Sequence, residues 1–288
     1  MDISIEALGL QMLNVGLAQH DGDWNWQNVS SPFIRIYLVM EGSALLHLPD
    51  RTIELRPQRL YVIPANMTHS YECHGKFSHY YLHVQESYKN ATDIFDYYDF
   101  PFEVEAGIMD AHIFATLCSL HPEAALPTSN PEKYDNQHTL ADYVQRYNDM
   151  EFSEKLRIRG CVLILISRFA KYAVRRKWTC DERLMKALQY IRTHLYENIS
   201  INDIAAEACV SKQYFISLFT KALGIPPLRY ITKKRIERAQ LLLATEHGSI
   251  QDIAYEMGFN ETSYFVRKFR EYTGTTPGEY RRNIGLSI

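Results

Sequence analysis

Histidine is the residue type in this chain whose spacing most directly suggests chemistry, because four histidines lie between residues 69 and 83. They are His69, His74, His79 and His83. A neutral imidazole is the commonest metal ligand in proteins. His79, Tyr81 and His83 alternate along the chain and therefore share one face of a strand. We interpret the four as buried or solvent-exposed histidines, with a metal site as the less favoured alternative.

Other patterns for catalysis or metal binding are absent from the sequence. The five cysteines show no CxxC spacing, so neither a zinc module nor a redox pair is indicated. There is no GxSxG, no P-loop and no HExxH. The sequence therefore predicts a protein that is not an enzyme, with no catalytic residue, no metal and no cofactor.

The histidines fall in a part of the chain whose pattern is typical of strands. Residues 33 to 84 form short apolar or alternating runs separated by turn residues such as Gly42 and Pro57. The predicted strands cover residues 34–40, 44–48, 52–55, 60–63 and 80–84. Their spacing is typical of an antiparallel barrel or sandwich.

The last hundred residues contain a repeated phrase. Ser-Ile-Asn-Asp-Ile-Ala at residues 200–205 returns as Ser-Ile-Gln-Asp-Ile-Ala at residues 249–254, 49 positions later. Each serine can accept a hydrogen bond from the third helical amide, and each aspartate lies near the positive helix end. Each phrase therefore predicts the start of a helix.

A second amphipathic helix follows each copy, over residues 212–223 and 262–272, after a turn at Cys209 or Gly258. A helix, a tight turn and a second helix with a polar outer face can place that second helix in the DNA major groove. A plain helical hairpin is the alternative for one copy, and the shared capping pattern of two copies favours DNA binding. A helix beginning at Pro227 joins them, so the two recognition helices are expected roughly 34 Å apart.

Residues 183–282 resemble the DNA-binding domain of the AraC/XylS family of bacterial transcription regulators. The resemblance rests on the doubled phrase, on Gly258-Phe259-Asn260 with Tyr264-Phe265, and on Gly274-Thr275-Thr276-Pro277 with Tyr280-Arg281. It implies that six residues read DNA bases: Gln213, Ile216, Ser217, Thr262, Ser263 and Arg267. Arg267 suits guanine, Gln213 suits adenine, and Ile216 offers an apolar contact such as a thymine methyl.

Basic residues around these helices are expected to contact phosphates, which position the protein without specifying sequence. They are Lys212, Lys233, Lys234, Lys268, Arg281 and Arg282. Residues 181–288 hold 15 Lys and Arg against 12 Asp and Glu, a net charge of +3, whereas the remainder has a net charge of −6. This surplus is too small to predict a non-specific polyanion binder.

The strand region resembles a cupin, as in the N-terminal effector domain of arabinose-type members of the same family. Many cupins bind a metal through an HxH pair, a glutamate and a later histidine. His69 falls where the later histidine is expected, but the earlier strand offers only His47. This departure makes a metal site less favoured.

Similarity to the sugar-responsive members places Tyr71, His79 and Tyr81 in an effector pocket. Arg35 and Tyr37 alternate on an earlier strand, and we assign them to the same pocket. The expected effector is a sugar, although Tyr81 stands where the arabinose-type pattern has a tryptophan. Packing in an ordinary core is the alternative for the aromatic residues.

Two helices are expected between these regions, over residues 130–148 and 153–177. The second is too apolar for one packing face, so one side should meet the barrel and the other a second copy of the chain. Arg175-Arg176-Lys177 should begin a linker.

The expected fold class is α+β, with an antiparallel cupin-like barrel, then helices, then an all-α domain with two helix-turn-helix units. The expected division is a sensing domain at 1–125, a helical dimerisation region and linker at 126–177, and a DNA-binding domain at 178–288. The predicted protein is a cytoplasmic homodimeric regulator that binds double-stranded DNA and a carbohydrate effector, with RNA polymerase as a partner if it activates. The sequence shows no membrane span or signal peptide.

Two other functions remain open at this point. One is a metal-dependent cupin enzyme fused to a DNA-binding domain, which would require a bound transition metal. The other is a regulator without a ligand, whose barrel serves only for dimerisation.

Overall fold

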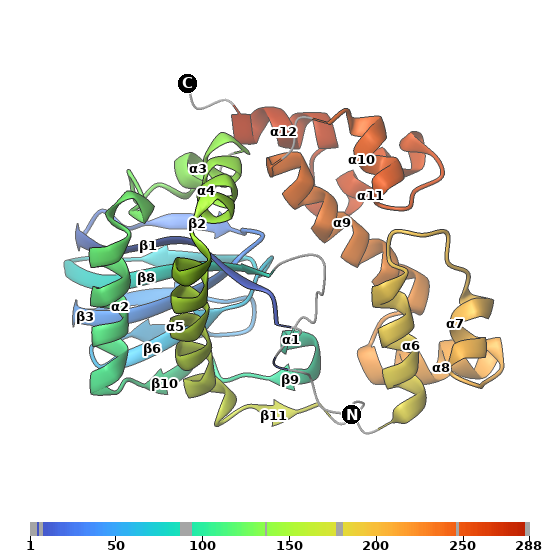
Figure 1. The fold of residues 1–288 in the computed structure, drawn as a ribbon, viewed down its shortest axis with the longest axis horizontal. Coiled ribbons are helices and arrows are strands. Elements are labelled where there is room, and N and C mark those ends of the chain that lie inside the picture. Colours follow the sequence, from blue (N-terminus) through green and yellow to red (C-terminus); the bar gives the residue numbers. More distant parts are fainter. Residues whose placement is uncertain are drawn as a thin grey trace. The chain divides into compact units, whose positions relative to one another are not determined.

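The computed structural model describes residue 5 and residues 8–86, 94–135, 137–176, 181–245 and 248–285. Within it the chain forms two compact units, residues 3–174 and residues 175–288. Figure 1 labels the elements of both units.

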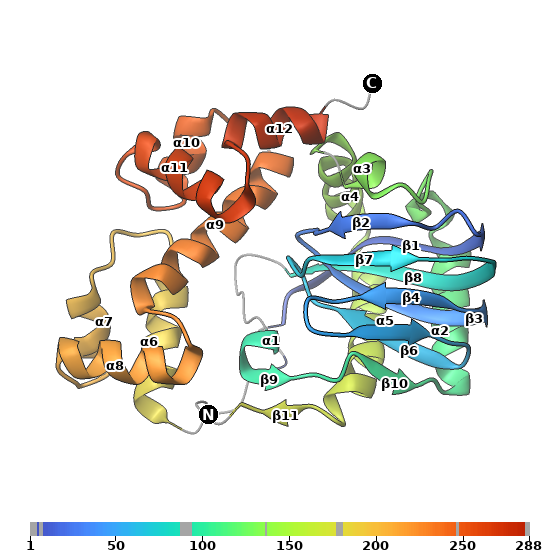
Figure 2. The same ribbon diagram turned by 180° about the vertical axis from the view of Figure 1, so that it is seen from behind.

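Two antiparallel sheets form the centre of the N-terminal unit. The five-stranded sheet has the order β1-β8-β3-β6-β10, and the four-stranded sheet has the order β2-β7-β4-β5. The strands of the larger sheet are β1 (Leu10–Asp21), β8 (Lys76–Glu86), β3 (Ile34–Gly42), β6 (Arg59–Ile63) and β10 (Glu103–Glu105). Those of the smaller sheet are β2 (Trp26–Val29), β7 (His69–Glu72), β4 (Ala44–His47) and β5 (Thr52–Leu55). Figure 2 shows the smaller sheet in front of the larger one.

Successive side chains of β3 and β8 point to opposite faces of the larger sheet, and both faces are buried. On β3, Ile36 and Leu38 pack against helices, whereas Tyr37 and Val39 point between the sheets. On β8, Leu82 and Val84 pack on the helical side. Because successive side chains of a strand point to opposite faces, the residues between the sheets form a separate core, and that core holds the polar groups discussed below.

Helices cover the outer face of the larger sheet. The helices of this unit are α1 (Ile94–Tyr97), α2 (Ile108–Leu120), α3 (Pro131–Tyr134), α4 (Gln137–Asp149) and α5 (Phe152–Ala170), with a short 3-10 turn at Pro122–Ala124. Figure 1 shows α2 and α5 lying across the sheet. Phe114 and Leu117 of α2 and Val162 and Leu165 of α5 are buried there. Two very short strands, β9 (Tyr98–Asp99) and β11 (Val174–Arg175), pair with each other.

The helices between the predicted domains differ from the sequence prediction. The predicted helix over 130–148 is two helices, α3 and α4. The predicted helix over 153–177 ends at Ala170 and is followed by β11, with Lys177 outside the described residues. The apolar spacing correctly predicted the helix α5. It did not predict that residues 174–175 would be extended and pair with β9.

The C-terminal unit is entirely helical in its described residues. Its helices are α6 (Glu182–Thr193), α7 (Ile201–Glu207), α8 (Lys212–Leu223), α9 (Pro227–Thr245), α10 (Ile250–Glu256), α11 (Thr262–Thr273) and α12 (Pro277–Gly285). The predicted capping boxes are present: Asp203 N–H donates to Ser200 Oγ, and Asp252 N–H donates to Ser249 Oγ. The predicted antiparallel β domain followed by a helical domain is therefore confirmed.

Candidate effector pocket and nucleic-acid interface

The turns of the two helix pairs require unusual backbone angles. Cys209 has a φ of 54° and Gly258 has a φ of 74°, both in the left-handed region. Glycine adopts this region without steric cost, whereas Cys209 is a less usual choice. Both turns had been predicted from the sequence, and each reverses the chain so that α7 packs on α8 and α10 packs on α11.

The second helix of each pair has one buried and one exposed side. Phe215 and Phe219 of α8 and Phe265 and Phe269 of α11 are fully buried. The opposite side of α8 exposes Lys212, Gln213, Ile216 and Ser217, and that of α11 exposes Ser263 and Arg267. Thr262 at the start of α11 is half-buried. Five of the six predicted base-reading residues are therefore exposed to solvent.

Arg267 is one of the exposed cations of α11. Its guanidinium carbon lies 5.3 Å from the centre of the Tyr264 ring, in a cation–π contact. This contact orients the side chain at the helix surface. A guanidinium held in this way can donate two parallel hydrogen bonds to guanine.

The predicted phosphate contacts have different surroundings. Lys233 and Lys234 lie 3.7 and 3.4 Å from carboxylate oxygens of Glu237, and Lys268 Nζ lies 2.7 Å from Glu271. Three of the six cations therefore already face carboxylates. Lys212 and Arg282 are exposed, whereas Arg281 is half-buried and burial lowers the pKa of its guanidinium.

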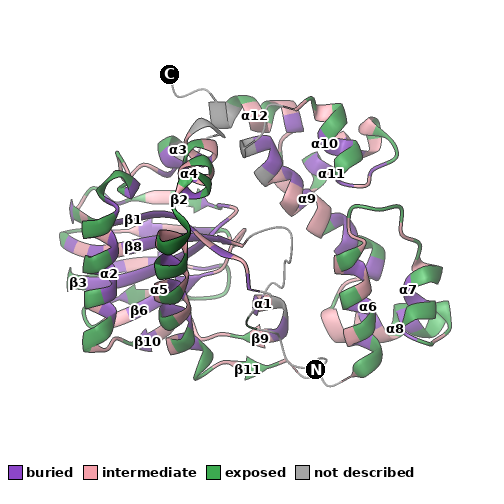
Figure 3. Ribbon diagram, in the orientation of Figure 1, coloured by how far each residue is buried: buried purple, intermediate pink, exposed green. Residues whose placement is uncertain are grey.

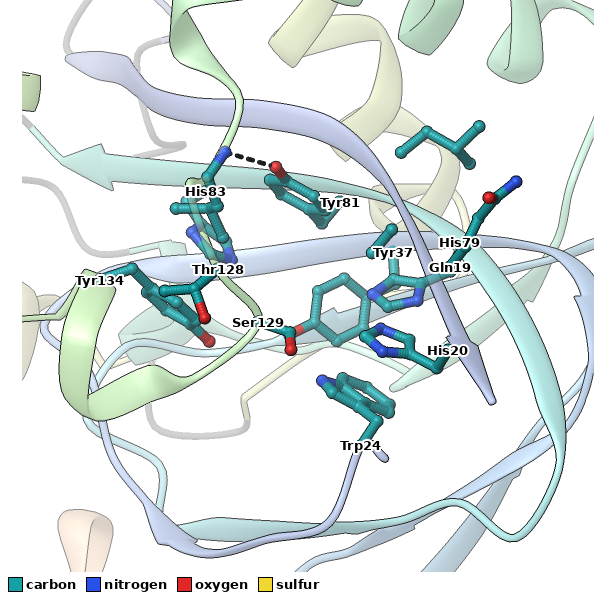
Figure 4. Close-up of a pocket in the computed structure, with 13 residues that line it drawn as sticks. Gln19, His20, Trp24, Tyr37, His79, Tyr81, His83, Thr128, Ser129 and Tyr134 are labelled. Carbon is teal, nitrogen blue, oxygen red and sulfur yellow. Dashed lines mark hydrogen bonds between the residues drawn. The ribbon is translucent and has the colours of Figure 1, made fainter. Parts of the chain in front are cut away.

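A pocket of the N-terminal unit lies against β1, β3 and β8 of the larger sheet, with a cavity volume of about 210 Å³ (Figure 4). Aromatic and histidine side chains dominate its wall. The lining residues are Leu17, Ala18, Gln19, His20, Trp24, Tyr37, His79, Tyr81, His83, Leu126, Thr128, Ser129 and Tyr134. Apolar faces with a few aimed polar atoms are typical of sites for small molecules.

Stacked rings form one end of this pocket. The His20 ring lies 5.3 Å from Trp24 and 5.5 Å from His79, and both pairs are stacked. Tyr37 meets His79 edge to face at 4.9 Å. Figure 4 shows these four rings together, with His83 and Tyr134 further along the wall. Aromatic faces of this kind bind the apolar face of a ligand.

The pocket histidines are held uncharged. Burial lowers the pKa of His20, and this effect outweighs the opposing carboxylate of Asp23. Burial also places the pKa of His79 and His83 well below the usual range; the neighbouring His20 adds to the shift of His79, and the Arg35 guanidinium adds to that of His83. Nδ1 of His79 and Nδ1 of His83 are buried without a hydrogen-bond partner among the described residues. Such unpaired atoms are costly unless a bound molecule satisfies them.

The segment after the helix α2 crosses the pocket and is fixed at both ends. The Leu126 N–H donates to Tyr81 Oη at 2.7 Å. Farther on, Asp135 accepts from Arg35 Nη2 at 3.1 Å and also from Ser31 Oγ. Burial raises the pKa of Asp135 to about 6, against the opposing effect of the Arg35 guanidinium. This segment contributes Leu126, Thr128, Ser129 and Tyr134 to the wall.

The structure places three of the five predicted effector residues in the pocket wall: Tyr37, His79 and Tyr81. The other two lie behind it. The Arg35 guanidinium is directed to Asp135 and Ser31, and the Tyr71 hydroxyl contacts Tyr37 and His69. Arg35 and Tyr71 therefore do not line this pocket, because neighbouring polar groups within the fold already engage both side chains.

Several wall residues were not predicted from the sequence. His20 lies on β1, a strand that the turn pattern did not show. Thr128, Ser129 and Tyr134 come from a segment whose position depends on contacts with β3 and β8. Trp24 precedes the first predicted strand, and its aromatic side chain was the available signal.

The register of the smaller sheet separates the two histidines considered for a cupin metal site. His47 pairs with Ser70, so it lies on the face opposite to His69 and Tyr71. His47 Nε2 instead contacts Glu72 at 2.9 Å on the half-exposed face. Within the described ranges, no three His, Cys, Asp or Glu side chains lie together as a metal site would require.

A β domain with a pocket of aromatic and polar side chains, together with two capped helix-turn-helix units, defines the class of ligand-responsive transcription regulators. Comparison with known proteins agrees. Residues 15–121 match the AraC-like ligand binding domain, and residues 204–283 match a helix-turn-helix domain. The chain belongs to the AraC family of transcription regulators.

Its relatives differ in how much of their length is matched. The arabinose operon regulatory protein of Escherichia coli is 26% identical over 85% of this chain and 78% of its own length. The regulatory protein PocR of Salmonella typhimurium is 38% identical over 36% of this chain, and the match covers only 34% of its own length. The higher identity is thus confined to about a third of each protein.

The fold of both units is similar to that of a solved structure. ToxT from Vibrio cholerae is 14% identical, with a TM-score of 0.51, over 96% of this chain and 98% of that one. At this identity the similarity establishes the fold alone. No described helix combines the length and apolar character of a membrane span.

Proposed function

We propose that this protein is a cytoplasmic transcription regulator that binds specific double-stranded DNA through α8 and α11 and is controlled by a small molecule in the N-terminal pocket. The observation that carries the proposal is the pocket of neutral histidines and aromatic rings in the same chain as two capped helix-turn-helix units. The pocket binds the effector, and the exposed faces of α8 and α11 contact the DNA bases.

Arg267 offers a direct test of DNA reading. We expect Arg267→Ala in the full-length protein to lower affinity for a selected DNA site by about 10- to 100-fold, because a bidentate contact with guanine contributes about 1–3 kcal/mol. Arg267→Lys is the matched control, since it keeps the charge but loses the planar fork. Sites would be selected from a random pool, and binding measured by fluorescence anisotropy.

The two variants separate base reading from attraction to phosphates. Arg267→Lys should retain more non-specific affinity than Arg267→Ala and yet lose preference at one base pair. If Arg267→Ala selects the same sites with unchanged affinity, α11 does not read bases through this residue.

We infer that the effector is a neutral, hydroxyl-rich molecule such as a monosaccharide. The stacked rings of His20 and Trp24 offer flat surfaces for an apolar sugar face, and the unpaired nitrogens of His79 and His83 offer polar contacts. The relative named for the arabinose operon supports the same class of ligand.

A thermal-shift screen of the full chain against monosaccharides tests this inference. A ligand at a hundredfold its Kd stabilises the folded protein by about 2.7 kcal/mol. The response should be lost in Trp24→Ala and kept in Trp26→Ala. If no monosaccharide stabilises the wild-type protein, the carbohydrate assignment is wrong.

The second proposed partner is another copy of the chain. The outer side of α5 exposes Phe152, Leu156 and Ile164, at 76%, 59% and 48%, four or eight positions apart on one helical face (Figure 3). An apolar stripe of this kind is unusual on a monomer surface. We expect light scattering to give a dimer for the wild type and a monomer for Leu156→Glu. A wild-type monomer would rule out this interface.

The effector would act by changing the relative populations of different dimer arrangements. A ligand that favours one dimer arrangement changes which DNA half-sites the two protomers can hold together. If the regulator activates transcription, RNA polymerase is the expected further partner.

A further inference from the structure

Three hydrogen bonds in series connect a backbone carbonyl to the pocket wall. His69 Nδ1 lies 2.7 Å from the Met67 carbonyl oxygen, and His69 Nε2 lies 2.7 Å from the Tyr71 hydroxyl. The Tyr71 hydroxyl in turn lies 2.7 Å from the Tyr37 hydroxyl. Tyr37 lines the pocket, whereas His69 and Tyr71 lie behind it.

The Met67 carbonyl determines which atom donates and which accepts in each of the three hydrogen bonds. A carbonyl oxygen only accepts, so His69 Nδ1 must carry the proton. In a neutral imidazole the other nitrogen, Nε2, is then an acceptor, and Tyr71 must donate to it. Tyr71 has a single proton, so its oxygen can only accept from Tyr37. Tyr37 therefore uses its own proton inside the protein.

The charge states of the three side chains are consistent with this direction. Burial, aided by the charge of Arg35, lowers the pKa of His69 to about 3, so the ring is neutral near pH 7. Burial raises the pKa of Tyr37 and of Tyr71, so both phenols keep their protons. Arg35 also donates a hydrogen bond to the Tyr37 hydroxyl. A guanidinium carries donors only, so it cannot accept the Tyr37 proton and uses the Tyr37 oxygen as an acceptor.

We propose that His69 and Tyr71 are specificity-determining residues that hold the Tyr37 hydroxyl as a hydrogen-bond acceptor, so that the pocket selects an effector with an O–H or N–H group at this point. A carboxylate, ether or keto oxygen at the same point would face a second acceptor. The proposal rests on the proposed function, in that the pocket is the effector site.

The direction of the series can be measured without any effector. In the full-length protein labelled with ¹⁵N-histidine, two-dimensional NMR distinguishes a protonated from an unprotonated ring nitrogen. We expect the His69 signal, assigned by its loss in His69→Gln, to show a protonated Nδ1 and an unprotonated Nε2. A protonated Nε2 would overturn the proposal, because Tyr71 would then be free to donate to Tyr37.

A second measurement tests selectivity, with a monosaccharide that binds the wild-type protein and its set of deoxyfluoro analogues as probes. Fluorine replaces a donating hydroxyl with a group that cannot donate. One analogue should lose about 10- to 100-fold in affinity, because a buried acceptor is left unpaired. Tyr71→Phe should shrink this loss, since Tyr37 is then free to donate to the fluorine.

Tyr61→Phe is the matched control, because it removes a hydroxyl that is buried equally but bonds Glu54 O and Arg56 N–H elsewhere. It should leave the ratio of sugar to analogue affinity unchanged. An unaltered ratio in Tyr71→Phe would overturn the proposal. If no monosaccharide binds at all, the carbohydrate assignment fails, and the His69 tautomer still decides the direction of the hydrogen bonds.

Discussion

Four histidines of the N-terminal unit, His20, His69, His79 and His83, are buried and have lowered pKa values. Their unfolded pKa is near 6.5. Below that pH the unfolded chain binds protons that the folded chain does not, so the free energy of unfolding falls as the pH falls. Above pH 6.5 both states are neutral and the contribution is fully present.

The pH dependence gives a prediction for stability. Each such histidine removes about 1.4 kcal/mol per pH unit of acidification below 6.5. Asp135 acts in the opposite direction, since its pKa is raised to about 6 and the folded state keeps a proton between about pH 6 and 4. The destabilisation from the four histidines should exceed the stabilisation from Asp135, so the free energy of unfolding should fall steeply between pH 6.5 and 5.

Urea unfolding of the full chain at pH 8, 7, 6 and 5 measures this loss. His79→Gln should reduce the slope by about one proton, while the exposed His74→Gln serves as the control. A stability that stays flat from pH 7 to 5 would contradict the charge states assigned to the pocket.

Gly16 of β1 lies directly across from Tyr81, a residue of the pocket wall. A Cβ at this position would lie 2.2 Å from the hydroxyl oxygen of Tyr81, closer than any real contact. We expect Gly16→Ala to displace the Tyr81 ring and break its bond with Leu126 N–H, at a cost of about 1–3 kcal/mol. Gly75→Ala is the control, because nothing lies within 4 Å of its added Cβ. Equal melting temperatures for the two variants would contradict the packing of Tyr81.

The sequence predicted those elements that depend on interactions between residues close together in the chain. The serine and aspartate caps at residues 200 and 249 form as expected, because the groups that satisfy the first helical amides lie three residues away. The strand β1 was missed, since it packs on helices and on β8 over most of its length and lacks simple alternation. The wall segment at 126–135 depends on Arg35 and Tyr81, about 100 and 45 residues away, which no local pattern reveals.

The helix α9 carries a residue that connects the two helix-turn-helix units. Arg235 donates to the carbonyl oxygens of Leu195 and Glu197 before α7, and to that of Gly258 in the second turn. These bonds fix the ends of α6 and α10 to the same guanidinium. Arg235 therefore helps to set the relative orientation of α8 and α11.

Arg235→Lys tests this connection, because lysine keeps the charge but cannot reach three carbonyls with one fork. We expect a loss of about 2–4 kcal/mol in unfolding free energy from the unpaired carbonyls. Affinity for a site spanning two groove segments should fall more than affinity for a half-length site. Leu228→Ala is the control, because Leu228 lies on the same helix, is 57% exposed and is not among the predicted DNA contacts. An equal effect on both DNA lengths would argue against the connecting role.

At the scale of the whole molecule, the two units have separate chemistry: a pocket lined by neutral histidines in one, and in the other the exposed residues of α8 and α11 that we propose read DNA bases. Regulation requires that occupancy of the pocket changes the DNA affinity of the helices. Such coupling between sites is typically 1–3 kcal/mol, or about 5- to 150-fold. The segment at 126–135 is the part of the pocket wall that leads directly into α4 and α5, and we expect it to transmit occupancy to the dimer contact.

The most direct measurement is the affinity of the full-length protein for its selected DNA, with and without a saturating sugar identified by the thermal-shift screen. We expect the sugar to change the Kd by at least about fivefold. Trp24→Ala should keep the DNA affinity measured without sugar and lose the response to the sugar. An unchanged Kd, with the pocket shown to be saturated, would contradict the central claim that this pocket controls DNA binding.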